Sequence, residues 1–129
     1  MMLNQERIYN AFFKAQDAFN TNQYSQFDID VIQDYVHWGK MIGCVHREGS
    51  PSENNLLQEL FLRRVFFDLL SAIEDEKRSM TFRRVCLDNI YIPLMCLKRF
   101  YHAFSYGHEK LLALHSRLST AQIRFNCHL

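Results

Sequence analysis

The sequence predicts an all-α protein, organised as one compact domain over residues 1–129 with about five helices and a central helix near residues 51–76. Three observations support this fold class. Apolar residues recur at spacings of three and four through most of the chain, which is the period of a helix face. The chain contains only 4 Gly and 2 Pro, whereas a sheet protein needs turn residues at each strand reversal. Hydrophobic residues make up 48% of the sequence, which is enough to form a real core.

The first two helices are expected over about residues 3–20 and from Ser25 onward. Ser25 and Asp28 resemble a capping box, with Asp in place of the usual Glu. Gly39 and Gly43 lie inside the second apolar pattern, and each disfavours a helix interior by about 1 kcal/mol relative to Ala. Either the second helix ends near Gly39, or the two glycines allow another backbone to come close. The apolar positions that define both helices are Ile8, Phe12, Ala15 and Phe19, then Phe27, Val31, Tyr35, Trp38, Ile42 and Val45.

The third helix has the clearest start signal and the most apolar sequence. Residues 50–53, Ser-Pro-Ser-Glu, supply a hydroxyl for the N-cap, a proline for the first turn and a Glu at the third position. From Leu56 to Ile73 the apolar residues fill two adjacent stripes, which is typical of a helix covered on most sides. We therefore expect this helix to be the central one. The stripes are Leu57, Phe61, Val65, Leu69 and Ile73, and Leu56, Leu60, Phe67 and Leu70, with Leu62 and Phe66 beside them.

The last two helices are expected from Met80 or Thr81 onward and over residues 108–125. Pro93 breaks or kinks the first of these, because proline has no N–H and clashes with the preceding turn. Gly107 separates the two helices. The final helix carries a heptad-like apolar seam, which favours packing along one long neighbour.

Charge is divided unevenly along the chain. Residues 1–62 carry four Lys or Arg against eight Asp or Glu, a net charge of −4, and residues 63–129 carry eleven against six, a net charge of +5. Such asymmetry is typical of a half that binds a polyanion or an acidic partner, or of two halves that attract each other within one fold.

The cysteine pattern favours a cytoplasmic protein. The four cysteines, Cys44, Cys86, Cys96 and Cys127, form no CxxC pair, and the N-terminal residues show no secretory pattern. We therefore expect reduced and mostly buried thiols. The longest uncharged stretch near the centre, residues 89–97, is too short to cross a bilayer, so no membrane partner is expected.

The function predicted from the sequence is a non-catalytic protein-binding module. The chain contains no GxSxG, no glycine-rich phosphate loop and no paired-carboxylate signature, so neither catalytic residues nor a cofactor is expected. Aromatic residues make up 14% of the chain, more than one small core needs, which favours a regulator, adaptor, chaperone or immunity-type inhibitor. Its partner is expected to be another protein or a second copy of the chain in a homodimer. The residues expected at this surface are Tyr9, Phe13 and Phe66, with Asp30 and Asp34 at the rim.

Two alternative functions remain open from the sequence. The first is a nucleic-acid-binding regulator, in which basic pairs form a phosphate-binding ridge. The residues of this ridge are Arg63, Arg64, Arg83, Arg84, Lys98 and Arg99. The second is a metal-binding helical protein, because 6 His and 4 Cys supply imidazole and thiolate groups, although the spacings HxxxH, HExxH, ExxH and CxxC do not occur.

Overall fold

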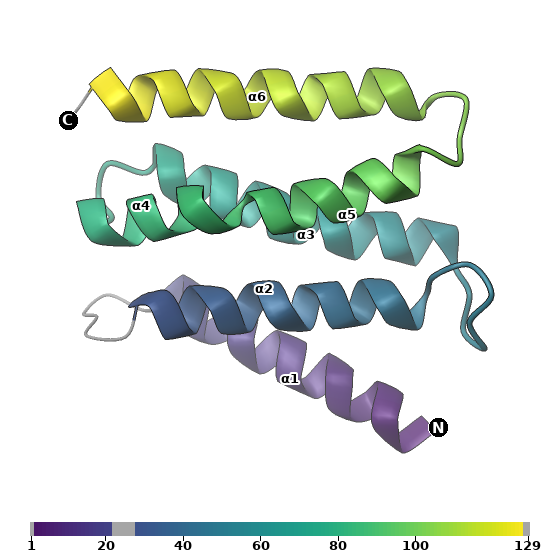
Figure 1. The fold of residues 1–129 in the computed structure, drawn as a ribbon. Helices are drawn as coiled ribbons and strands as arrows, with labels where there is room; N and C mark the ends of the chain where they lie inside the picture. Colours follow the sequence, from purple (N-terminus) through teal and green to yellow (C-terminus); the bar gives the residue numbers. More distant parts are fainter. Residues whose placement is uncertain (1, 22–27, 128–129) are drawn as a thin grey trace.

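The chain folds into an all-helical bundle (Figure 1). The computed structural model describes residues 2–21 and 28–127, and these residues contain six α-helices and no strand. The helices are α1 (Met2–Thr21), α2 (Asp28–Val45), α3 (Asn55–Glu74), α4 (Met80–Asn89), α5 (Tyr91–Tyr101) and α6 (Gly107–Cys127). Since only Ile90 separates α4 from α5, the prediction of an all-α bundle of about five helices is confirmed. In this part of the chain, no helix combines the length and the apolar character that a membrane crossing requires.

The helix α3 is the centre of the bundle, as predicted. It contacts α2, α4, α5 and α6, and eight of its residues are buried. Figure 1 shows α2 on one side of the central layer and α6 on the other. The helix α1 packs mainly on α2 and reaches α3 through aromatic rings, with the centroids of Phe12 and Phe61 5.4 Å apart.

Aromatic rings from four helices fill the core. Phe12, Tyr35, Phe66 and Phe125 are each at most 1% exposed. The rings of Phe19 and Tyr35 join α1 to α2 with their centroids 5.0 Å apart. Burial of each such side chain stabilises the fold by about 1.5–3 kcal/mol. The core therefore accounts for much of the high aromatic content of the sequence.

The two glycines of α2 allow α3 to come close. The helix continues past both of them to Val45, so the alternative in which it ends near Gly39 is wrong. A Cβ atom on Gly39 would lie 2.4 Å from Cγ2 of Val65, and one on Gly43 would lie 3.0 Å from Cδ2 of Leu62. The close neighbours are thus side chains of α3 rather than its backbone.

The start of α3 differs from the prediction. Its N-cap is Asn54, whose side chain accepts a hydrogen bond from the amide of Leu57 at 3.1 Å. The hydroxyl of Ser50 instead donates to the carbonyl of Val45 at 2.7 Å and so completes the end of α2. The segment before α3 forms a turn. Gly49 allows the chain to reverse there, because its φ of 84° is a conformation that favours glycine. The predicted capping box at Ser25 lies outside the described residues.

The helix expected from Met80 or Thr81 onward is divided into α4 and α5 at Ile90, rather than being one helix kinked at Pro93. Pro93 has no amide hydrogen, so the carbonyl of Asn89 receives no helical hydrogen bond from it. The neighbouring bonds persist, because Ile90 N donates to Cys86 O at 2.9 Å and Leu94 N donates to Ile90 O at 3.2 Å. Pro93 therefore lies in the first turn of α5, where a helix tolerates proline.

Gly107 begins α6 instead of preceding it. A Cβ atom at this position would lie 1.9 Å from the carbonyl oxygen of Tyr101. The tight return from α5 to α6 therefore requires a residue without a side chain.

Candidate functional site

Apolar side chains remain exposed on neighbouring faces of α1 and α3. Phe13 is 45% exposed, Leu60 is 47% exposed and Leu56 is 74% exposed. The ring centroid of Phe13 lies 6.3 Å from that of Tyr9 and 6.4 Å from that of Phe61, which joins α1 to α3. We define the α1–α3 surface as Tyr9, Phe13, Leu56, Leu60 and Phe67.

The faces of α3 follow from its helical register. Leu56, Leu60 and Phe67 share one side of the helix, since their spacings of four and seven bring side chains into line. Leu62 and Val65 lie on another side and are covered by α2. The exposed stripe is therefore the part of this apolar helix that no other described element covers completely.

Guanidinium groups border the α1–α3 surface and lie over its rings. Arg64 lies over the ring of Phe61, with 5.2 Å between its Cζ and the centroid. Arg63 and Arg117 both lie over the ring of Phe67, at 5.0 Å and 5.5 Å. Such cation–π contacts hold the guanidinium planes in place, and Nη1 of Arg63 also donates to the hydroxyl of Tyr101 at 3.0 Å. The part of the border formed by α3 and α6 is therefore positively charged.

The carboxylate of Glu59, beside this border, is bonded within the fold. Its Oε2 accepts hydrogen bonds from the hydroxyl of Tyr101 at 2.6 Å and from Nζ of Lys110 at 2.9 Å. Burial acts to raise the pKa of Glu59, but these two hydrogen bonds outweigh it and hold the pKa below its usual value. Burial and the bond to Glu59 raise the pKa of Tyr101 to about 12. The network ties α3 to α5 and α6.

A second carboxylate of α3 faces the opposite side and is also bonded. Oδ2 of Asp68 accepts from the hydroxyl of Tyr35 at 2.5 Å and from the amide of Gln16 at 3.3 Å. Burial and this carboxylate raise the pKa of Tyr35 far above its usual value. Both carboxylates of α3 thus stabilise helix packing through bonds within the fold.

The predicted partner-binding residues do not form one cluster. Tyr9 and Phe13 lie in the α1–α3 surface. Phe66 is fully buried on the core side of α3, so its assignment to a surface is wrong; its ring centroid lies 5.2 Å from that of its chain neighbour Phe67. Asp30 and Asp34 are exposed on α2, where Asp34 accepts a hydrogen bond from the indole of Trp38 at 3.2 Å.

The basic pairs also do not form one continuous ridge. Arg63 and Arg64 border the α1–α3 surface, whereas Lys98 and Arg99 lie on α5. Arg83 is buried, and its Nε donates to the carbonyl of Ile73 at 2.8 Å, so its assignment to an exposed ridge is wrong. It caps the end of α3 rather than meeting a ligand. Arg84 is exposed on α4, with its Cζ 5.3 Å from the ring centroid of Phe125.

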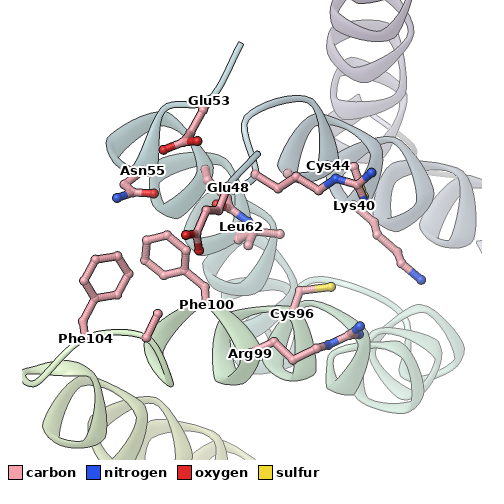
Figure 2. A pocket seen from close by; sticks show the side chains of 14 residues that line it. Lys40, Cys44, Glu48, Glu53, Asn55, Leu62, Cys96, Arg99, Phe100 and Phe104 are labelled. Atoms are coloured by element: carbon pink, nitrogen blue, oxygen red, sulfur yellow. The ribbon is translucent and has the colours of Figure 1, made fainter. Parts of the chain in front are cut away.

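A pocket of about 530 Å³ opens between α2, α3 and α5 (Figure 2). Cys44 of α2 and Cys96 of α5 both line this pocket, together with the cations Lys40 and Arg99. The sequence did not predict this pocket, because no spacing signals that residues 52 positions apart share a cavity. The lining residues used below are Lys40, Cys44, Arg47, Cys96 and Arg99.

The histidines and cysteines show no metal-binding arrangement among the described residues. No group of three or more His, Cys, Asp or Glu side chains in those residues comes together as a metal site. His46 is used internally: its ring is bonded to the hydroxyl of Tyr9, and its Nδ1 donates to the carbonyl of Ser52 at 2.8 Å. These contacts fasten α1 to the loop before α3.

Comparison of the chain with protein-family models, with curated proteins and with solved structures found no match in any of the three. The arguments below therefore rest on the geometry of this chain alone.

Proposed function

We propose that this protein is a non-catalytic, cytoplasmic protein-binding module, a small regulator, adaptor, chaperone or inhibitor. Its α1–α3 surface binds a helix of another protein. That helix presents an apolar stripe flanked by carboxylates.

The observation that carries this proposal is the exposure of Phe13, Leu56 and Leu60 next to bordering guanidinium groups. Covering a large apolar side chain stabilises a complex by about 1.5–3 kcal/mol before the costs of association are subtracted. Aromatic and Arg side chains grouped in this way are typical of the residues that dominate binding energy.

The charge of the border decides which partner is favoured. Arg64 and Arg117 lie over phenylalanine rings, while the carboxylate of Glu59 is bonded to Tyr101 and Lys110. A second copy of the chain would bring like charges together across a symmetric contact, which costs free energy. An acidic partner helix instead supplies the carboxylates that bidentate contacts to arginine require.

The proposal is tested by capture and reconstitution. The purified chain, immobilised, is exposed to a lysate of its source cells, and captured proteins are then expressed, purified and mixed with it again. We expect a purified partner to bind the wild-type chain and to lose binding to Leu60→Asp. Leu112→Asp is the matched control, because Leu112 is an exposed leucine of α6 outside the α1–α3 surface.

One outcome of this experiment supports the proposed partner-binding surface, and two overturn it. Binding of the purified partner to wild type and Leu112→Asp, but not to Leu60→Asp, supports the proposal. Equal binding to all three variants overturns the assignment of this surface. Tight, salt-sensitive binding of a single-stranded oligonucleotide that is lost in Arg63→Gln and Arg64→Gln, with no protein bound, overturns it in favour of nucleic-acid binding.

A further inference from the structure

Two cysteines from different helices line the same pocket between α2, α3 and α5. Cys44 is exposed on α2, and Cys96 is half-buried on α5. Both side chains line the pocket of about 530 Å³, and a charge on Cys44 acts to raise the pKa of Cys96. Figure 2 shows the sulfur of Cys96 directed into the space below Cys44.

Each helix also places a cation beside the two thiols. Lys40 stands one turn before Cys44 on α2, and Arg99 stands three residues after Cys96 on α5. Burial raises the pKa of Cys96, and the charges of Arg99 and Lys40 partly offset this effect. The exposed thiol is therefore the one that an incoming reagent meets first.

The remaining charges of the pocket favour an anionic reagent. Arg47 adds a third cation, and it lies with Glu48 and Glu53 in the loop between α2 and α3. One of these carboxylates is engaged, because Oε1 of Glu53 accepts from the amide of Gly49 at 2.8 Å. The charged residues that line the pocket from α2 and α5, the helices that carry the thiols, are thus the cations Lys40 and Arg99, whereas both carboxylates come from the loop.

We propose that Cys44 and Cys96 form a redox pair, oxidised to an intramolecular disulfide by a low-molecular-weight disulfide that carries carboxylates and enters this pocket. This inference is independent of the α1–α3 surface, since the two sites share none of the residues that define them. The bridge joins α2 to α5 and closes the pocket across its width.

The chemistry proceeds by two thiol–disulfide exchanges. The thiolate of Cys44 attacks one sulfur of the small disulfide, which forms a mixed disulfide and expels the other half as a thiolate that takes up a proton. The thiolate of Cys96, having released its proton to water, then attacks the sulfur of Cys44 and expels the second half. Two protein thiols are oxidised, and one small disulfide is reduced to two thiols.

The test uses the full-length chain and oxidised glutathione as the probe. After incubation and alkylation of free thiols, peptide mass spectrometry is expected to find a peptide in which Cys44 is bonded to Cys96. The Cys96→Ser variant is expected to stop at a stable glutathione adduct on Cys44. Cys127→Ser is the matched control, because Cys127 is an exposed cysteine outside the pocket, and it is expected to form the bridge as wild type does.

The charge of the reagent provides a second readout. Oxidised glutathione is expected to react with Cys44 about tenfold faster than the cationic disulfide cystamine, and Lys40→Gln with Arg99→Gln is expected to remove this preference. Glutathione adducts on Cys127 and Cys44 at equal rates, with no Cys44–Cys96 peptide, would overturn the proposal. An internal bridge that forms equally fast with both reagents would overturn the assigned anionic co-reactant.

Discussion

Two faces of α3 carry the same residue types and meet opposite surroundings. On the face toward α2, Leu62 is 3% exposed, and it lies against Gly43 at the distance where a single Cβ atom would touch it. On the stripe between α1 and α6, Leu60 is 47% exposed and its neighbours are arginines lying over rings. The face with Leu62 is covered closely by α2, because the glycines of α2 have no side chains. The face with Leu60 is not covered completely by any other described helix.

The two faces of α3 are assigned different roles here: the covered face stabilises the fold, and the exposed face is the one proposed to bind a partner. Core packing needs only one broad face of α3, because α2, α4, α5 and α6 cover it. The additional apolar residues Leu56 and Leu60 remain exposed, which is typical of a contact surface. Substitutions on the two faces are therefore expected to act on different measurements.

The largest effect is expected on the buried face. Leu62→Ala removes a side chain that fills the contact with Gly43, and the cavity left behind costs about 2–5 kcal/mol of unfolding free energy. Urea denaturation followed by circular dichroism measures this loss. A Leu62→Ala chain as stable as wild type would contradict the close packing of α2 on α3.

The approach of the two helices is tested by Gly39→Ala. The added Cβ lies 2.4 Å from Cγ2 of Val65, a β-branched side chain with little rotamer freedom, so α2 and α3 must separate. We expect a loss of about 1–3 kcal/mol in unfolding free energy. In a double-mutant cycle, Val65→Ala is expected to relieve part of this loss, and additive effects would show that the two positions do not touch.

A smaller effect is expected from the carboxylate that borders the open face. The pKa of Glu59 is lower in the folded protein than its ordinary value of 4.5. The ionised carboxylate therefore stabilises the fold above pH 4.5, and this stabilisation is lost as the pH falls through the lowered pKa of the folded state. Glu59→Gln is expected to lose about 1–2 kcal/mol at neutral pH. Thermal melts from pH 7 to pH 3 should show the difference between wild type and variant shrinking, and a constant difference would contradict the network with Tyr101 and Lys110.

The sequence predicted the helices well because their periodicity is local. The broad apolar pattern of residues 56–73 correctly indicated the central helix, and Ser79 and Gly107 mark boundaries within a residue or two of those expected. The start of α3 was misplaced, because Ser50 and Asn54 are both competent caps and only the loop geometry selects Asn54.

The candidate site was predicted only in part, for a physical reason. Periodicity shows which residues share a face of α3, but it does not show which faces the other helices cover. Phe66 and Leu60 are equally apolar in sequence, yet one is buried and the other is open. Likewise, the placement of Cys44 and Cys96 in one pocket depends on how α5 lies against α2, which local spacing does not encode.

The most direct test compares affinity with stability for one residue of the open face. Leu60→Ala is expected to change the unfolding free energy by less than about 0.5 kcal/mol. In a titration of the purified partner, the same variant is expected to weaken the Kd by about tenfold or more, while Leu112→Ala leaves it unchanged. An unchanged Kd for Leu60→Ala, measured on a chain with wild-type stability, would contradict the claim that the open face of α3 is the binding surface.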